Sequence, residues 1–191
     1  MNNRRDVWRL ADLLQRALFL FEKAGINSPR TDAELLLAHC LSLSRTELYL
    51  RAEDVVGEAQ ADSCLGIFER RCRREPVAYI TGECEFWSQS FEVTPAVLIP
   101  RPETELLIEH VLARDDDFYK QSKCLDLCSG SGIIAIVLAL ELGLELITVE
   151  ISNPALEICR RNCVRHGVEK KVQLIQADLT TCFLENEQFG L

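Results

Sequence analysis

Residues 123–140 read KCLDLCSGSGIIAIVLAL, and this stretch decides the fold class. A short apolar run, Cys124–Leu127, leads into the glycine-rich segment Cys128–Gly132, and a long segment of Ile, Ala, Val and Leu follows. The pattern predicts a buried parallel strand, a tight turn and a packed helix. Gly130 and Gly132 allow the backbone to approach a bound group, and the helix start offers unpaired N–H groups. The turn is therefore a candidate ligand-binding loop.

A carboxylate follows at a distance typical of nucleoside sites. A second strand-like run, Leu144–Val149, ends in Glu150, which lies 20 residues after Gly130. Nucleotide-binding α/β units place an acid at this spacing, where it accepts hydrogen bonds from the ribose hydroxyls. Residues 130–135 also satisfy the loose dinucleotide fingerprint. The spacing predicts a nucleoside site and leaves NAD and S-adenosylmethionine both open.

A third predicted strand, Val172–Gln176, is followed by Ala177, Asp178 and Leu179. Ligands of open parallel sheets bind at the carboxyl ends of the strands. Asp178 is therefore a candidate to accept a hydrogen bond from the adenine amine, and Leu179 a candidate to pack on the ring. A solvated loop aspartate or a helix cap explains Asp178 equally well.

The bulk composition predicts a globular protein of one large or two small domains. The chain has 191 residues, of which 48% are hydrophobic, and its longest apolar runs fall short of the ~20 residues that a membrane span needs. The N-terminus lacks the pattern of a secretory signal, so we expect a cytoplasmic protein. Nine cysteines without a Cys-x-x-Cys pair are expected to be small buried side chains in a reducing compartment, and no metal site is predicted.

Charge is distributed unevenly along the chain. Residues 1–78 carry 12 basic and 12 acidic side chains, so the net charge of −9 comes from residues 79–191. An acidic domain repels a phosphate backbone. Nucleic acid is therefore disfavoured as the direct substrate, and no membrane partner is expected.

The first 76 residues predict a small helical bundle. Helical spacing covers Val7–Lys23, with apolar residues at 7, 10, 14, 18 and 21, and further helices are predicted over 30–43 and 57–74. Ser44 and Glu47 form a predicted capping box for a short helix that lies between the helices at 30–43 and 57–74. The segment shows no catalytic constellation, so we interpret residues 1–76 as a substrate-recognition domain.

The composition of residues 77–100 predicts a hairpin linker. Aromatic residues flank the polar run 88–90, which predicts two short strands joined by a turn. Pro102 then begins a helix with Glu103 in its first turn, where the helix dipole favours an acid. Residues 101–191 are predicted to form the ligand-binding domain, and Asn153 with Pro154 is predicted to cap the helix after Glu150.

Several separate stretches together resemble the HemK/PrmC family of release factor glutamine methyltransferases. They are PVAYITG at 76–82, EFW at 85–87, FEV at 91–93, LIPRPETE at 98–105, the loop 125–132 and QAD at 176–178. The string at 98–105 is more specific than any glycine loop. The resemblance favours S-adenosylmethionine over NAD, and it implies an α/β fold with a Rossmann-like class I S-adenosylmethionine-dependent methyltransferase domain.

The resemblance implies N5-methylation of the glutamine in the Gly-Gly-Gln loop of peptide chain release factors. Residue by residue, it implies that Glu150 holds the ribose diol and that Asp178 and Leu179 hold the adenine. The methionine part would lie on Cys128, Ser129, Gly130, Ser131 and Gly132, and the pocket border would consist of Arg101, Pro102, Glu103 and Thr104. Many relatives have glycine at position 128, and we expect the small cysteine to permit the same turn.

The family's Asn-Pro-Pro-Tyr motif is not in this sequence, which ends where the fourth strand would begin. An amide nitrogen is a poor nucleophile because its lone pair is delocalised, so this motif has to position it. We therefore assign no catalytic residue and expect the 191-residue chain to bind cofactor weakly if at all and not to turn over. We also expect an unpaired edge on the first strand of the sheet, and self-association through it.

Two other functions remain as alternatives. An amino-methyltransferase that acts on nucleic-acid bases presents a different NH₂ group with a similar motif, but the acidic charge disfavours it. A non-catalytic module that binds a release factor without cofactor is the second alternative.

Overall fold

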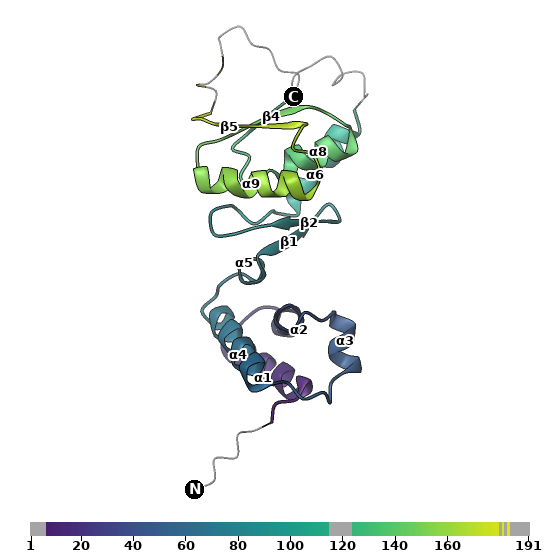
Figure 1. Ribbon diagram of the computed structural model, residues 1–191, viewed down its shortest axis with the longest axis vertical. Coiled ribbons are helices and arrows are strands. Elements are labelled where there is room, and N and C mark those ends of the chain that lie inside the picture. Colours follow the sequence, from purple (N-terminus) through teal and green to yellow (C-terminus); the bar gives the residue numbers. More distant parts are fainter. Residues whose placement is uncertain (1–6, 115–123, 180, 182, 184–191) are drawn as a thin grey trace. The chain divides into compact units, whose positions relative to one another are not determined.

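The computed structural model describes residues 7–114, 124–179, 181 and 183 (Figure 1). Contacts between Cα atoms divide the chain into two units, residues 1–81 and 82–191. Each unit has a hydrophobic core of its own. The N-terminal unit is helical, whereas the C-terminal unit combines a hairpin, helices and a parallel sheet.

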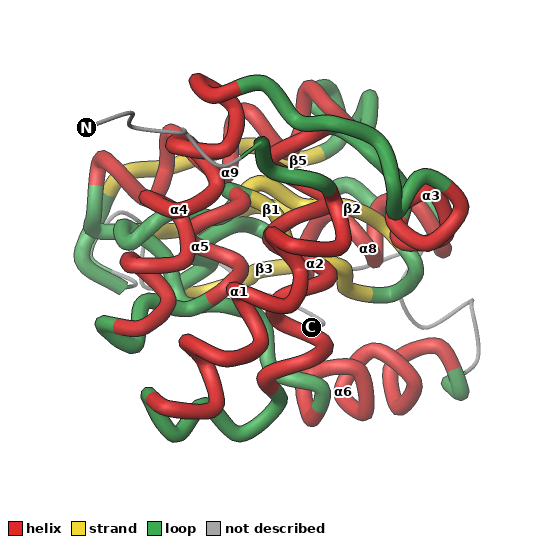
Figure 2. The backbone as a smooth tube through the Cα atoms, turned by 90° about the horizontal axis from the view of Figure 1, so that it is seen from below, coloured by secondary structure: helices red, strands yellow, loops and turns green. Residues whose placement is uncertain are grey.

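The described part of the N-terminal unit is a bundle of helices, drawn in red in Figure 2. Phe21 and Phe68 meet edge to face in its core, with ring centroids 5.8 Å apart. Four of the helices confirm the predicted ones, and the fifth lies in the stretch assigned to the linker, with Ile80 buried in the bundle core. The helices are α1 (Leu10–Lys23), α2 (Pro29–Leu41), α3 (Arg45–Leu50), α4 (Glu58–Cys72) and α5 (Val77–Thr81).

The buried face of α1 differs from the predicted one. Val7 precedes the helix and is 66% exposed, and the predicted core positions Leu14 and Leu18 are only half-buried. The sequence has adjacent apolar pairs at 13–14 and 17–18, and a helical spacing accommodates either member of each pair. The structure buries the first member, so the core face of α1 consists of Leu10, Leu13, Ala17 and Phe21.

The predicted helix caps are confirmed at one position and corrected at another. The Oγ atom of Ser44 accepts a hydrogen bond from the Glu47 N–H at 3.2 Å, and the Glu47 carboxylate accepts one from the Ser44 N–H at 2.8 Å. The helix after Glu150 is capped by Ser152 rather than by Asn153. Asn153 is already the first residue of that helix.

A β-hairpin opens the C-terminal unit. Its strands, β1 (Glu83–Phe86) and β2 (Gln89–Glu92), are antiparallel and confirm the predicted hairpin. The turn consists of Trp87 and Ser88, whereas the sequence predicted it over residues 88–90. Trp87 and Ser88 have positive φ angles of 53° and 54°. The Trp87 N–H groups donate to Glu105 from the backbone at 2.9 Å and to Glu141 from the indole at 2.8 Å. These two bonds hold an aromatic residue in a backbone region that it rarely adopts.

Three parallel strands follow in the order β3-β4-β5. The pairing is parallel throughout, so helices form the crossover connections, as the sequence predicts. Among the described residues β3 pairs with β4 alone, and self-association through its other edge stays a prediction. The elements are α6 (Glu103–Leu112), β3 (Cys124–Leu127), α8 (Ile133–Glu141), β4 (Leu146–Glu150), α9 (Asn153–Arg165) and β5 (Val172–Gln176).

Helix α9 lies between the sheet and the hairpin (Figure 1). The hairpin side chain Phe91 is fully buried and packs against the His166 ring, with centroids 4.6 Å apart. At the surface, the Arg161 guanidinium makes a two-pronged ion pair with Glu92. The hairpin is therefore packed onto α9, and α9 in turn contacts the sheet and the loop after β3.

Several features are absent from the described part of the chain. Its cysteines are free thiols, and Cys64, Cys124, Cys159 and Cys163 are buried. These residues contain no group of three or more His, Cys, Asp or Glu side chains arranged to hold a metal ion. None of the helices described here is long and apolar enough to span a bilayer.

Candidate functional site

The carboxyl ends of β3, β4 and β5 meet at one edge of the sheet. The strand register pairs Leu127 with Val149 and Glu150 with Gln176, so neighbouring strands end side by side. The loop Cys128–Gly132 follows β3, Glu150 ends β4, and the segment with Asp178 and Leu179 follows β5. The structure thus brings these predicted site residues to the same edge of the sheet.

The loop after β3 is anchored on the neighbouring strand. The N–H groups of Cys128 and Ser129 both donate to the Val149 carbonyl, at 2.8 and 3.2 Å, and the Gly132 N–H donates to the Ser129 carbonyl at 2.8 Å. Cys128 is exposed and has a φ angle of 60°. A non-glycine residue there costs about 1–2 kcal/mol relative to glycine. The cysteine therefore permits the turn, but with backbone strain.

The two loop glycines have different roles. A Cβ atom at Gly130, where φ is 54°, would meet no atom within 4 Å. A Cβ atom at Gly132, where φ is 79°, would overlap the Sγ atom of Cys159 on α9. Gly130 therefore keeps open space beside the loop, as expected for approach to a ligand. At Gly132 the absence of a side chain serves instead the close packing of α9.

Glu150 is held against the loop by two backbone donors. Its Oε2 atom accepts a hydrogen bond from the Gly130 N–H at 3.0 Å, and its Oε1 atom accepts one from the Ser152 N–H at 2.9 Å. A carboxylate has about four lone-pair sites, so two remain available to other donors. The side chain is half-buried and fixed at the point where β3 and β4 end.

Asp126, on β3, is a site residue to which the sequence reading gave no role. Its Oδ2 atom and the Ser129 Oγ atom are buried without a hydrogen-bond partner among the described residues. Burial raises the pKa of Asp126 to about 6, the charge of Glu150 adds to this, and a hydrogen bond from the Ala135 backbone opposes it. The signal was present in the sequence, because a charged residue within the apolar run 124–127 is rarely buried without a partner. Two unpaired polar atoms beside the loop fit a polar ligand.

Asp126→Asn is expected to remove a pH dependence of stability. The folded-state pKa is raised from 3.8 to about 6, so the contribution of Asp126 is fully present below pH 3.8 and is lost as the pH rises through 6. One pKa unit corresponds to about 1.4 kcal/mol, so the loss amounts to about 3 kcal/mol at pH 7. Urea unfolding followed by Trp87 fluorescence in a Trp8→Phe background measures the part of this loss between pH 4.5 and pH 7, which is about 2 kcal/mol. An unchanged pH dependence in the Asn variant would contradict the burial of this carboxyl group.

Asp178 and Leu179 lie past the end of β5 and are both exposed. The Ala177 N–H donates to the Glu150 carbonyl at 3.3 Å, which links this segment to the end of β4. The Asp178 carbonyl accepts from the Thr181 N–H at 3.1 Å, and Leu179 has a φ angle of 47°. Both side chains are thus accessible beside Glu150.

The four predicted border residues lie at the start of α6. Arg101, Pro102 and Glu103 are exposed and Thr104 is half-buried. The Thr104 N–H donates locally to the Arg101 carbonyl at 3.0 Å. Among the described residues, no hydrogen bond joins this segment to the loop after β3. Glu103 and Thr104 belong to α6, and Arg101 and Pro102 directly precede it, so the role of the segment as a pocket border stays a prediction.

Asn162 on α9 joins the hairpin to the loop. The side chain is fully buried, and its Oδ1 atom accepts a hydrogen bond from the Glu92 N–H at 2.8 Å. Its Nδ2 group donates to the Glu92 carbonyl at 3.1 Å and to the Ser131 carbonyl at 3.0 Å. The sequence reading missed this residue, because a polar residue within a helix of mixed composition gives no sign of burial.

Comparison with known proteins identifies two regions of the chain. Residues 12–82 match the model of the PrmC N-terminal domain, and residues 124–191 match that of a methyltransferase domain. A release factor glutamine methyltransferase from Chlorobaculum tepidum is 39% identical over 177 residues, which are 90% of this chain and 60% of that protein. One from Escherichia coli is 38% identical over 165 residues, 86% of this chain and 58% of that protein. The chain spans about 60% of the length of these curated relatives.

Among solved structures, an RNA methyltransferase from Salinibacter ruber in complex with S-adenosyl-L-homocysteine is 28% identical to the chain. The match covers 44% of this chain and 52% of that one, with a TM-score of 0.37. That overlap is too small to support a conclusion about this chain.

The fold expected from the sequence is confirmed by the described elements and by the two matched regions. A helical N-terminal region and a hairpin precede part of a Rossmann-like domain of the class I S-adenosylmethionine-dependent methyltransferases, with its strands in parallel order. The relatives span both regions in the same order. Over the length that aligns, the chain is similar to the release factor glutamine methyltransferases, and its helical N-terminal region matches the PrmC N-terminal domain.

Proposed function

We propose that this chain provides the cofactor-binding and substrate-recognition parts of an S-adenosylmethionine-dependent methyltransferase. Its substrate would be the glutamine of the Gly-Gly-Gln loop of peptide chain release factors. The observation that carries the proposal is the contact between Glu150 and the Gly130 N–H, where two adjacent parallel strands end. The names of the relatives support the choice of a release factor as the protein substrate.

Each part of the cofactor has a proposed partner. The loop Cys128–Gly132 would hold the methionine part, and Glu150 would accept hydrogen bonds from both ribose hydroxyls through its two remaining lone-pair sites. Asp178 would accept from the adenine amine, and Leu179 would pack on the ring. When bound, S-adenosylmethionine supplies a methyl group on a positively charged sulfur. The segment 101–104 would border the same pocket from α6.

The fit of a cationic cofactor is supported by Asp126. Its buried and unpaired Oδ2 atom lies next to the loop, and an ammonium group placed there would offset the cost of ionising this carboxyl. The Ser129 hydroxyl would donate to, or accept from, the same end of the ligand. Both groups are otherwise costly to bury.

We also propose a separate function for each of three segments of the chain. Residues 1–76 would recognise the release factor, residues 77–100 would link the two parts, and residues 101–191 would bind the cofactor. Methyl transfer requires the substrate amide to be held in line with the methyl–sulfur bond. The Asn-Pro-Pro-Tyr motif that the resemblance implies for this task is not among these 191 residues, and we assign no catalytic residue here.

Calorimetric titration tests the cofactor assignment. We expect saturable, weak binding of S-adenosylmethionine that Glu150→Gln weakens about tenfold or more, because hydrogen bonds to a charged group contribute about 1.5–3 kcal/mol. Glu157→Gln is the matched control, since Glu157 is an exposed acid that pairs with Arg160 on α9. NAD is titrated in parallel. Equal affinity for NAD would contradict the choice of S-adenosylmethionine as the cofactor, and wild-type affinity in Glu150→Gln would rule out the proposed ribose contact.

A further inference from the structure

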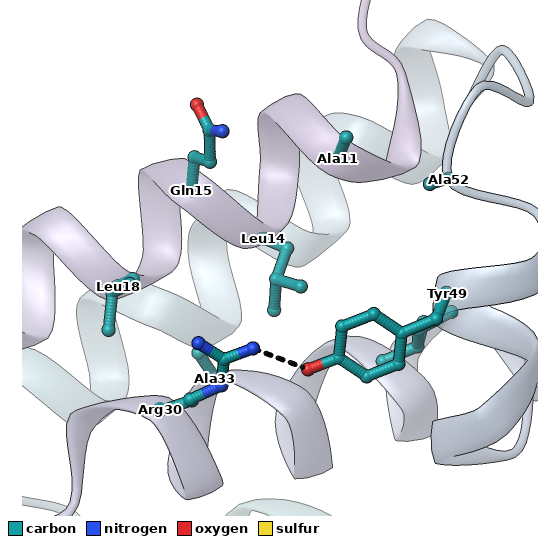
Figure 3. A pocket seen from close by; sticks show the side chains of 9 residues that line it. Ala11, Leu14, Gln15, Leu18, Arg30, Ala33, Tyr49 and Ala52 are labelled. Carbon is teal, nitrogen blue, oxygen red and sulfur yellow. Dashed lines mark hydrogen bonds between the residues drawn. The ribbon is translucent and has the colours of Figure 1, made fainter.

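A cavity of about 300 Å³ opens among α1, α2 and α3 in the N-terminal unit (Figure 3). Its lining includes Leu14 and Leu18 of α1, Ala33 of α2 and Leu48 of α3. Leu14 and Leu18 are half-buried, which is the departure from the predicted core face of α1 noted above. The cavity has the size at which ligand pockets begin, and most of its lining side chains are apolar.

The cavity persists because small residues surround it. Ala11 on α1, Ala33 on α2 and Ala52 after α3 all face it, so larger neighbours do not fill the space. Ala11 and Ala52 are also joined through the backbone, where the Ala11 N–H donates to the Ala52 carbonyl at 2.9 Å. An apolar side chain entering the cavity would remove both its own surface and that of Leu14 and Leu18 from water.

The rim of the cavity carries a fixed positive charge. Glu34, which is 4% exposed, accepts hydrogen bonds from Arg30 Nε at 3.1 Å, from Arg45 Nε at 3.1 Å and from the Tyr49 hydroxyl. The hydrogen bonds from Tyr49 and Arg45 hold the pKa of Glu34 below its usual range. Two guanidinium groups therefore share one carboxylate, and the cluster has a net charge of +1.

Arg30 and Tyr49 present the accessible part of this rim. The Arg30 side chain is 70% exposed, and its Nη2 group donates to the Tyr49 hydroxyl at 3.2 Å (Figure 3). The hydrogen bonds of Arg30 to Glu34 and Tyr49 use its Nε and Nη2 groups, so part of its guanidinium faces solvent. Tyr49 is 48% exposed. An exposed aromatic residue and a positioned arginine beside an apolar cavity are typical of the energetic centre of a protein interface.

We propose that this cavity is a docking site for the protein substrate. It would take one large apolar side chain of a surface segment whose neighbouring residue carries a carboxylate that pairs with Arg30. The inference rests on the proposed function for the identity of the partner, a peptide chain release factor. The positive charge of the rim favours an acidic neighbour. All lining residues except Ala11 lie within residues 12–82, which match the PrmC N-terminal domain, and Ala11 directly precedes that region.

Binding of purified, unmethylated release factor to the full 191-residue chain tests the docking site. Ala11→Leu places a side chain in the cavity, and we expect it to weaken binding about tenfold or more. Ala59→Leu is the matched control, because Ala59 is exposed on α4 and does not line the cavity. Thermal melting of both variants by circular dichroism shows that the bundle is folded. Equal binding by the two variants would overturn the proposal.

Two substitutions of opposite charge at one position test whether the docked segment carries a carboxylate. Gln15 is an exposed lining residue, so Gln15→Glu adds a negative charge to the rim and Gln15→Lys adds a positive one. We expect the Glu variant to bind about threefold or more weaker than the Lys variant at low salt, and the difference to shrink as salt is added. Indistinguishable binding by these two variants would contradict the proposed carboxylate.

The remaining outcomes separate the docking site from the cofactor site. No binding of release factor by the wild-type chain would overturn the docking proposal, whereas the titration of Glu150→Gln with S-adenosylmethionine decides the cofactor site independently. Sedimentation of the wild type and of Ala11→Leu tests whether a second copy of the chain occupies the cavity instead. A wild-type dimer that Ala11→Leu dissociates would likewise overturn docking of the release factor.

Discussion

Gly132→Ala is expected to lower the free energy of unfolding of the C-terminal unit by about 2–5 kcal/mol. Two costs add up in this substitution. The φ angle of 79° at this position costs an alanine about 1–2 kcal/mol. The new Cβ atom would also overlap Cys159 Sγ and approach Ile136 Cδ1 to 3.3 Å, and overpacking of a core costs about 1–3 kcal/mol.

Two further variants separate the steric cost from the backbone cost. Gly130→Ala is the matched control in the same loop, since φ is 54° but a Cβ atom there meets nothing within 4 Å. Gly130→Ala should lower the free energy of unfolding only by the backbone contribution of about 1–2 kcal/mol. Cys159→Ala in the Gly132→Ala background removes the overlapping Sγ atom and leaves the Cys159 Cβ position at 3.4 Å. This double variant should recover part of the stability relative to Gly132→Ala alone.

Urea unfolding measures the free energy of unfolding of all three variants. The chain has two tryptophans, and in a Trp8→Phe background Trp87 reports on the C-terminal unit, where its indole donates to Glu141. A loss in Gly132→Ala no larger than that in Gly130→Ala would show that α9 does not pack against the loop as described. Additive effects of Gly132→Ala and Cys159→Ala would lead to the same conclusion.

The parallel sheet and its glycine loop could be predicted because their signals are local. Apolar runs of strand length, a glycine-rich break and an acid at the end of the next run all lie within residues 124–150. The capping box of Ser44 and Glu47 is local in the same sense, and the structure confirms it. The contact between Glu150 and the Gly130 N–H then follows from the register of two neighbouring strands.

What the sequence could not provide depends on contacts between distant segments. Leu13 and Leu14 are indistinguishable by periodicity, and only packing against other helices decides which is buried. Gly132 looks like a second ligand-approach glycine until Cys159, 27 residues later, is seen to occupy the space beside it. The positive φ angle of Trp87 depends on Glu105 and Glu141, which accept its N–H groups.

Asn162 is the strongest case of such a distant contact, because its partners lie 70 and 31 residues away. The side chain satisfies three buried or half-buried backbone groups: the N–H and the carbonyl of Glu92, and the carbonyl of Ser131. The first two belong to β2 and the third to the glycine loop. One amide therefore fixes the hairpin and the loop to α9 at the same point.

Asn162→Leu is expected to lower the free energy of unfolding of the C-terminal unit by about 3 kcal/mol or more. Leucine has a similar size, so little space is left empty, but all three backbone groups lose their partner. Each unsatisfied buried group costs about 1–3 kcal/mol. Urea unfolding with the Trp87 probe measures the loss, and hydrogen exchange of the Glu92 amide measures the local opening that accompanies it.

Arg161→Leu is the matched control, since it joins the same two elements through a surface ion pair with Glu92. Exposed ion pairs contribute about 0–1 kcal/mol, so this variant should cost far less than Asn162→Leu. The comparison decides whether the buried amide or the surface charge holds the hairpin. If the two variants lose equal stability, or if the Glu92 amide stays protected in Asn162→Leu, the amide does not fix the hairpin. The loop would then owe its position to the strand β4 alone, through the Val149 carbonyl that accepts from Cys128 and Ser129.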